Sequence, residues 1–171
     1  MAADPPPLLT RGRCPIVQLG SSFKTNQFAG KWFKIGGLHN PREKAVQCTL
    51  YDYQKNAAGF QVSSSGLTSD NSPITEGNTL RQNEQNVGSF LATFHDLEAN
   101  MTVLTTDYTS YACVYTCYNF ESSHKTQFAW ILSRESTLPR QKIADCQVEL
   151  RRVGVPLKDL SATKQDGCTY T

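Results

Sequence analysis

Six cysteines and three histidines are the side chains of this sequence with the widest choice of chemistry. A cysteine can act as a nucleophile, bind zinc or form a disulfide, and a histidine can transfer protons or bind a metal. The spacings do not predict zinc, because Cys113-x-x-x-Cys117 lacks a second close pair that would complete four ligands. The chain also contains no Gly-x-Ser-x-Gly, no paired carboxylates and no histidine cluster. These residues therefore favour disulfide-bonded cysteines over a catalytic or a metal-binding site.

Spacing alone leaves the pairing of the cysteines open, although it restricts the choices. Four residues apart on a strand, Cys113 and Cys117 share one face and lie ~13 Å apart, too far to bond to each other. Cys146 lies in the apolar-periodic run Leu138–Leu150, which predicts a helix. In a barrel such a helix packs outside, so a bridge to Cys146 must start from an outward-facing cysteine.

Length and composition predict one compact domain. The chain has 171 residues with 17 basic and 15 acidic side chains, so its charge favours no nucleic acid partner. No stretch approaches the ~20 apolar residues of a membrane span. The Pro-rich start lacks the features of a signal peptide, yet six cysteines indicate an oxidising compartment. We therefore expect a secreted protein whose signal has been removed, with a flexible N-terminal arm (1–13) and a single domain (14–171).

Alternating, β-rich runs between turn residues predict an all-β up-and-down barrel, which would leave no free sheet edges. The expected strands are Phe28–Leu38, Val46–Tyr53, Gly59–Ser65, Ile74–Gln82, Gly88–Phe94, Met101–Thr105, Ser110–Tyr118 and Thr126–Ser133. One helix follows, with Ser136 or Thr137 as its N-cap and Pro139 in its first turn. It should end before Gly154, and the tail should return to the barrel.

Three separated motifs occur in the order of the lipocalin signature regions, which this chain resembles. They are Gly30-Lys31-Trp32, Thr106-Asp107-Tyr108, and Arg134 directly after Phe128–Ser133. The resemblance implies a secreted, eight-stranded antiparallel barrel that holds an apolar molecule, with one C-terminal α-helix packed outside. Trp32 should plug the closed end, and the guanidinium of Arg134 should stack on its indole in a cation–π contact.

Within this family, the run Asp107–Cys117 resembles the branch that contains apolipoprotein D, the insect bilin-binding proteins and the crustacyanin subunits. The pairs Cys14–Cys117 and Cys48–Cys168 resemble those of apolipoprotein D and the bilin proteins. A third pair, Cys113–Cys146, resembles the crustacyanin subunits. With this pairing no thiol is free, so catalysis by a cysteine inside the barrel, as in the prostaglandin D synthases of the family, is not expected.

Strand alternation then predicts which side chains line the interior. If Arg134 closes the end, Phe128 and Trp130 face inward with Leu132. If Cys113 and Cys117 face outward, Val114 and Thr116 face inward. Four more ligand-binding residues align with inward positions of the family: Tyr51, Tyr53, Met101 and Val103. His39 and His95 should lie near the open mouth, where an imidazole could donate a hydrogen bond to a ligand.

The resemblance implies a bound pigment, namely the ketocarotenoid astaxanthin, for coloration or pigment carriage. A carotenoid is longer than the barrel, so a homodimer or heterodimer through the open end is expected. The alternative is biliverdin binding, or a general lipid or retinoid carrier. A bilin has two propionates, for which Arg42, Lys44 and Arg81 could supply positive charge. The sequon at Asn100 leaves glycosylation open.

Overall fold

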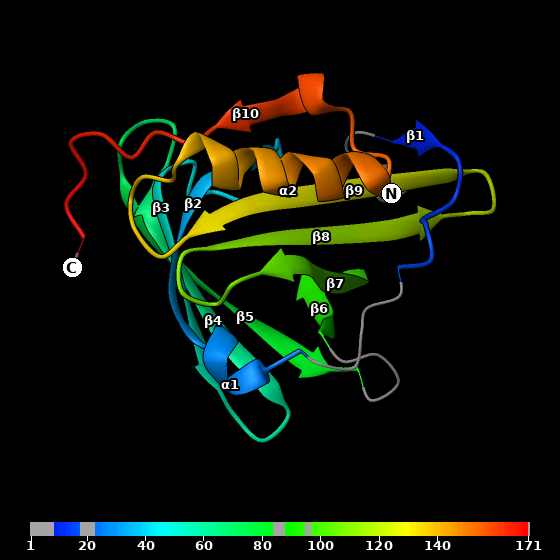
Figure 1. Ribbon diagram of the computed structural model, residues 1–171, viewed down its shortest axis with the longest axis horizontal. Helices are drawn as coiled ribbons and strands as arrows, with labels where there is room; N and C mark the ends of the chain where they lie inside the picture. Colours follow the sequence, from blue (N-terminus) through cyan, green and yellow to red (C-terminus); the bar gives the residue numbers. More distant parts are fainter. Residues whose placement is uncertain (1–8, 18–22, 84–87, 95–96, 171) are drawn as a thin grey trace, which may run out of the picture.

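The computed structural model describes residues 9–17, 23–83, 88–94 and 97–170, and its centre is a closed antiparallel barrel (Figure 1). The barrel strands are β2 (Gly30–Leu38), β3 (Gln47–Lys55), β4 (Gly59–Leu67), β5 (Pro73–Gln82), β6 (Ser89–Phe94), β7 (Leu97–Thr106), β8 (Tyr111–Phe120) and β9 (His124–Ser133). Each strand pairs with the next along the chain, and β9 returns to β2 to close the sheet. The eight-stranded architecture expected from the sequence is confirmed.

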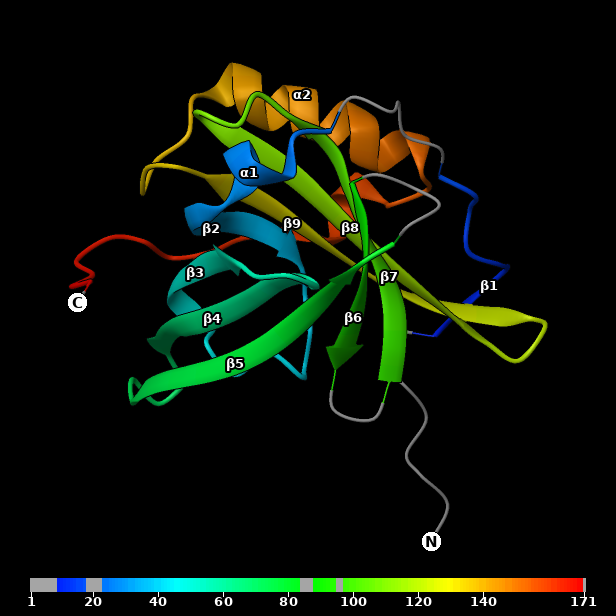
Figure 2. The ribbon, with the colours of Figure 1, turned by 90° about the horizontal axis from the view of Figure 1, so that it is seen from below.

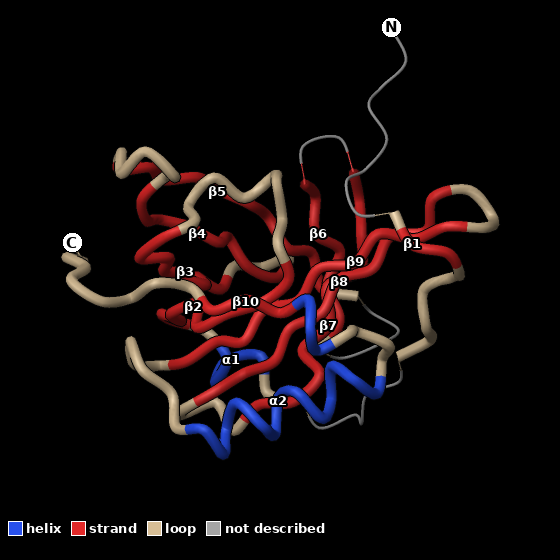
Figure 3. Tube along the Cα trace, turned by 90° about the horizontal axis from the view of Figure 1, so that it is seen from above, coloured by secondary structure: helices blue, strands red, loops and turns tan. Residues whose placement is uncertain are grey.

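Short elements extend this sheet and cover its outer surface. Strand β1 (Thr10–Arg11) pairs with β9, and β10 (Leu160–Ala162) pairs with β2 (Figure 3). Helix α2 (Arg140–Arg152) lies outside the barrel along β8 and β9 (Figure 1). The one-turn helix α1 (Thr25–Phe28) precedes β2, and the 3-10 turn η1 (Leu157–Asp159) precedes β10. Apart from β1, the N-terminal arm expected for residues 1–13 falls largely outside the described residues, so its boundary stays a prediction.

Residue alternation on the strands produces two separate apolar cores. The inner core contains Ala112 and Val114 of β8, whereas the residues between and beside them, Cys113 and Tyr115, belong to the outer core. This outer core is completed by the buried residues Cys146 and Leu150 of α2. The predicted facing of β8 is therefore confirmed.

The closed end of the barrel is organised by Arg134. Its guanidinium carbon lies 3.6 Å from the centre of the Trp32 ring, which confirms the predicted cation–π contact. The same guanidinium donates hydrogen bonds of 2.8–3.3 Å to the carbonyl oxygens of Gln27, Phe28, Ala29, Lys31 and Tyr108. One side chain thus connects α1, the start of β2 and the loop between β7 and β8.

Several predicted boundaries are wrong, because contacts in the fold take precedence over the sequence pattern. Strand β7 begins at Leu97 rather than Met101, since Leu97–Asn100 pair with Leu91–Phe94 of β6. Phe28 ends α1 instead of opening the first strand; its ring is fully buried, and its carbonyl accepts the indole N–H of Trp32 at 2.8 Å. The strand begins at Gly30, where φ is +106° and a Cβ would lie 3.2 Å from Arg134 Nη1. Helix α2 begins at Arg140, with Pro139 as its N-cap and no side-chain cap. Neither Ser136 nor Thr137 caps the helix.

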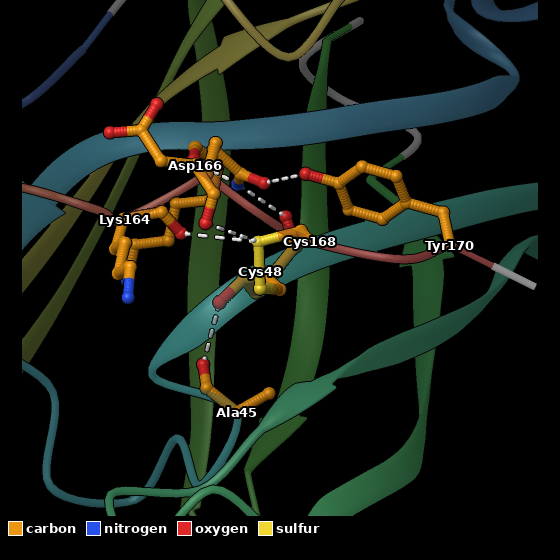
Figure 4. Close-up of a disulfide and its surroundings, with 9 residues drawn as sticks. Ala45, Cys48, Lys164, Asp166, Cys168 and Tyr170 are labelled. Atoms are coloured by element: carbon orange, nitrogen blue, oxygen red, sulfur yellow. Dashed lines mark hydrogen bonds between the residues drawn. A yellow bond between two sulfur atoms is a disulfide. The ribbon is translucent and has the colours of Figure 1, made fainter.

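The three predicted disulfides are confirmed. Cys14 is bonded to Cys117, Cys48 to Cys168, and Cys113 to Cys146, and no described cysteine is free. Cys113–Cys146 joins β8 to α2, and Cys14–Cys117 joins the N-terminal segment to the same strand. Figure 4 shows the third bridge, where the C-terminal tail passes β3 and Cys168 reaches Cys48. The bridges therefore join covering segments to the outside of the barrel.

We predict that Arg134→Lys lowers the free energy of unfolding by about 2–4 kcal/mol, because a lysine cannot serve the five carbonyl groups and the indole together. Urea unfolding followed by tryptophan fluorescence measures the change. Arg81→Lys is the matched control, since Arg81 forms an exposed ion pair with Glu98, and its effect should stay within about 0.5 kcal/mol. Equal effects of the two substitutions would contradict the closing role of Arg134.

Candidate ligand-binding site

A cavity of about 530 Å³ occupies the open half of the barrel. Its size falls within the range of small-molecule sites. Strands β3, β4 and β5 supply most of its wall, and the loop between β2 and β3 supplies its rim. The lining residues are Asn40, Arg42, Glu43, Tyr51, Tyr53, Gln61, Val62, Ser64, Glu76, Gly77, Asn78, Thr79, Leu80, Thr93, Met101 and Trp130.

Aromatic side chains fill the other half, next to the closed end. The Phe28 ring lies 5.2 Å from that of Trp32 and 6.1 Å from that of Phe60, and Phe60 lies 5.4 Å from Phe90. All four are fully buried. A ligand can therefore enter only the open half, and the aromatic cluster forms the floor that it meets.

Residues of β5 and β6 line one side of the cavity, where these two strands share few pairs. Strands β5 and β6 pair only over Leu80–Gln82 and diverge towards the open end (Figure 2). Residues of the outward face of β5, Gly77 and Thr79, contribute to the wall together with Thr93 of β6.

A buried carboxylate, which the sequence analysis did not identify, lies at the rim. Glu43 Oε1 accepts hydrogen bonds from Tyr51 Oη at 2.5 Å and Lys34 Nζ at 3.0 Å, and Oε2 accepts one from Trp130 Nε1 at 3.0 Å. The Lys34 and Glu43 side chains are only 12% and 11% exposed. The sequence feature that could have indicated this site is Lys34. It lies two residues after Trp32 on the same strand, so both side chains face the barrel interior, and a buried ammonium group there requires an acidic partner.

The phenols of the cavity wall stay protonated at neutral pH. Burial, and secondly the negative charge of Glu43, raise the pKa of Tyr51 and of Tyr53 above the usual value. Tyr51 uses its proton to bond Glu43, whereas no hydrogen bond of the Tyr53 hydroxyl occurs within the described residues. Tyr53 can therefore donate a hydrogen bond to a ligand.

The predicted lining residues divide into two groups. Tyr51, Tyr53, Met101 and Trp130 lie in the cavity wall. The other four face the barrel interior, as the alternation predicted, but pack beside the cavity rather than in its wall: Val103, Val114, Thr116 and Phe128. Their contact with a ligand stays a prediction.

Thr116 has an unusual environment within this packed group. It lies between Met101 and Phe128 in the sheet and is only 1% exposed. Its hydroxyl has no hydrogen-bond partner among the residues that the structure describes. A polar group is seldom left in that state.

The residues expected at the mouth have different positions where the structure describes them. His39 is exposed and lines a separate hollow of about 80 Å³ beside β10, while His95 lies outside the described residues. Of the three basic candidates for a bilin, Arg42 lines the cavity, Lys44 is exposed, and Arg81 pairs with Glu98 on the outer surface. A role in ligand binding for either histidine stays a prediction.

Other kinds of site have little support in the described part of the chain. It holds no group of three or more His, Cys, Asp or Glu side chains that could bind a metal ion. Its helices are also too short or too polar to cross a membrane.

Residues 29–165 match the model of the lipocalin and cytosolic fatty-acid binding protein family. The chain is a lipocalin. It therefore belongs to a family that binds small apolar ligands, in agreement with the cavity described above.

Individual relatives place the chain within this family. It is 23% identical over 172 residues to the crustacyanin-C1 subunit of Homarus gammarus, covering 96% of this chain and 95% of that protein. It is 27% identical over 161 residues to apolipoprotein D of Mus musculus, covering 92% and 85%. The crystal structure of apocrustacyanin C1 superposes with a TM-score of 0.84 at 23% identity, covering 95% of this chain and 93% of the other. This likeness confirms the lipocalin fold.

We predict that stability falls steeply as the pH rises above about 10. Because the folded pKa of Tyr53 exceeds the unfolded one, its contribution is complete below the unfolded pKa and is lost as the pH rises towards the folded pKa. Each such phenol should lower the free energy of unfolding by about 1.4 kcal/mol per pH unit in that range. Urea unfolding between pH 8 and 11 measures the slope, which Tyr53→Phe should reduce. An unchanged slope would show that Tyr53 ionises in the folded barrel.

We also predict that Trp130→Ala weakens the binding of a neutral apolar probe, N-phenyl-1-naphthylamine, by about 1–3 kcal/mol, while the barrel still folds. Trp130 lines the cavity and faces inward with Phe128 and Leu132. Probe fluorescence gives the affinity, and circular dichroism checks the fold. Trp130→Phe, which keeps a flat ring, should retain most of the affinity. Wild-type affinity in the alanine variant would show that ligands do not reach this side of the cavity.

Proposed function

We propose that this lipocalin is a secreted binding protein that holds one end of an elongated apolar chromophore, a ketocarotenoid such as astaxanthin, for coloration or pigment carriage. The observation that carries the proposal is the cavity: it is open, has an aromatic floor and contains a few convergent polar groups. Such a lining suits a long apolar molecule with sparse polar ends. The likeness to a crustacyanin subunit supports the carotenoid in particular.

The dimensions of the cavity indicate that a carotenoid would be held only in part. From Tyr53 to the first residue of β3, Gln47, the wall extends over six residue-to-residue steps, or about 20 Å. An extended forty-carbon carotenoid is on the order of 30 Å long, longer than a strand segment of that size. Since the floor is filled by Phe28 and Phe60, the remainder must protrude through the mouth.

A protruding apolar half favours a second subunit. Exposed apolar surface costs about 25 cal/mol per Å², so covering the free end of the ligand would stabilise a dimer. We therefore propose a homodimer or heterodimer through the open end of the barrel. Val46, which ends the rim loop, is an exposed apolar side chain on this side and could contribute to the contact.

Binding rather than catalysis is the proposed activity. The described cysteines are all in disulfides, and the cavity wall supplies phenols, amides and one held carboxylate rather than an activated nucleophile. The colour of a bound diketone would change through a hydrogen bond at its inserted end, for which the Tyr53 hydroxyl in the cavity wall is a candidate. Three disulfides support secretion, and we propose residues 14–171 as one lipocalin domain.

The alternative is a bilin or general lipid carrier, and one observation favours it. Arg42 lines the rim, where it could meet a propionate of biliverdin. Glu43 and Glu76 line the same cavity, however, and would repel that charge. A compact bilin would also need no second subunit.

Reconstitution decides between these functions. The protein is mixed with astaxanthin or with biliverdin, and each complex is examined by absorption spectroscopy and size-exclusion chromatography. We expect a red-shifted astaxanthin band in a dimer and at most weak biliverdin binding. Tyr115→Phe, which changes only the helix-covered outer core, is the control and should leave the spectrum unchanged. An unshifted, monomeric astaxanthin complex together with tight biliverdin binding would favour the alternative.

A further inference from the structure

The strongest polar anchor of the cavity is the Glu43 carboxylate, and its position is fixed from two sides. On the backbone, Glu43 N–H donates to Asn40 O at 3.0 Å, and Arg42 N–H donates to Asn40 Oδ1 at 3.0 Å, so the rim loop forms a tight turn. On the side chain, three donors from three strands hold the carboxylate: Lys34, Tyr51 and Trp130. A group held in this way cannot turn away when a ligand enters.

The Glu43 carboxylate has one hydrogen-bond acceptor position left for a ligand. A carboxylate has two oxygens and about four acceptor positions. Oε1 uses two positions for Tyr51 Oη and Lys34 Nζ, whereas Oε2 accepts only Trp130 Nε1 among the described residues. Because Glu43 belongs to the cavity wall, one position on Oε2 remains for a donor of the ligand.

The local charges decide which donor fits. The Lys34 ammonium, 3.0 Å from Oε1, balances the charge of Glu43, so the site does not require a cationic ligand. A ligand carboxylate at Oε2 would place two anionic oxygens together with no proton between them, which is unfavourable in a partly dry cavity. A neutral hydroxyl can donate to Oε2 and leave the balance unchanged.

We propose that Glu43 makes the cavity selective for neutral apolar ligands whose inserted end carries a hydroxyl group, against those that lack a donor or end in a carboxylate. This inference rests on the proposed binding function and deepens it. For a carotenoid, it means that the ring hydroxyl, and not only the keto group, is recognised.

The first test compares two symmetrical diketocarotenoids, astaxanthin and canthaxanthin, which differ in the ring hydroxyls. Symmetry makes the result independent of which end enters. Wild-type protein should bind astaxanthin about ten-fold more tightly or better, the value of a hydrogen bond to a charged acceptor. Tryptophan fluorescence quenching gives both affinities.

The double variant removes the carboxylate without leaving its lysine unpaired. In the double variant Lys34→Met with Glu43→Gln, the ratio should fall to about three-fold or less, mainly through weaker astaxanthin binding. The single variant Glu43→Gln should show the same trend if it folds. Glu98→Gln, an exposed carboxylate outside the barrel, is the control and should keep the wild-type ratio. An equal affinity for both carotenoids in wild type, or an unchanged ratio in the double variant, would overturn the proposal.

A second pair of ligands separates this inference from the carotenoid function. Retinol and retinoic acid share one skeleton and differ only at the polar end. Wild-type protein should prefer retinol, and the double variant should lose that preference. If neither carotenoid binds but this preference is present and depends on Glu43, the carotenoid function is wrong and the selectivity stands. If carotenoids bind without discrimination and retinol has no advantage, the selectivity is wrong and the carotenoid function stands.

Discussion

Arg134 and Trp32 form the contact on which the arrangement of the barrel depends. The guanidinium covers the indole at 3.6 Å and bonds five backbone carbonyl groups around it. Immediately above this contact β2 and β9 pair, with Phe33 opposite Ser133 and Lys34 opposite Leu132. Since side chains alternate along a strand, joining these strands at this register decides which residues of both enter the interior. Trp130 faces the cavity because Arg134 closes the end.

The cavity exists because the aromatic filling stops halfway. Phe28 packs on Trp32, Phe60 on Phe28 and Phe90 on Phe60, and all four rings are fully buried near the closed end. Further up, side chains of β3, β4 and β5 surround a cavity of about 530 Å³. Polar side chains of the rim loop, β4 and β5 also line this part, among them Glu43, which reaches in from the rim loop. A ligand therefore meets an apolar floor and a polar rim.

The disulfides act on the outside of the barrel and leave the interior for a ligand. Cys113 and Cys117 occupy outward positions of β8, next to the inward Val114 and Thr116. One strand thus carries both the covalent attachment of α2 and a wall of the inner core. Closing long loops in this way constrains the unfolded chain, so stability need not come from filling the cavity. A hollow barrel can tolerate unfilled volume because its surrounding segments are cross-linked.

The amino-acid sequence by itself determined the features that depend on the local pattern of residues and on the alternation of side chains between the two faces of a strand. The eight strands, the helix with Cys146, the facing of β8 and the stacking of Arg134 on Trp32 all followed from alternation and from the resemblance to the lipocalins. Only the tertiary structure decided where free volume remains, because this depends on how far Phe28, Phe60 and Phe90 reach across the barrel. For the same reason Val114 and Phe128 face inward and yet lie outside the cavity wall. The Glu43 site likewise joins a loop residue to Lys34 and Trp130, which lie on different strands, and no local pattern specifies a contact between side chains 87 residues apart.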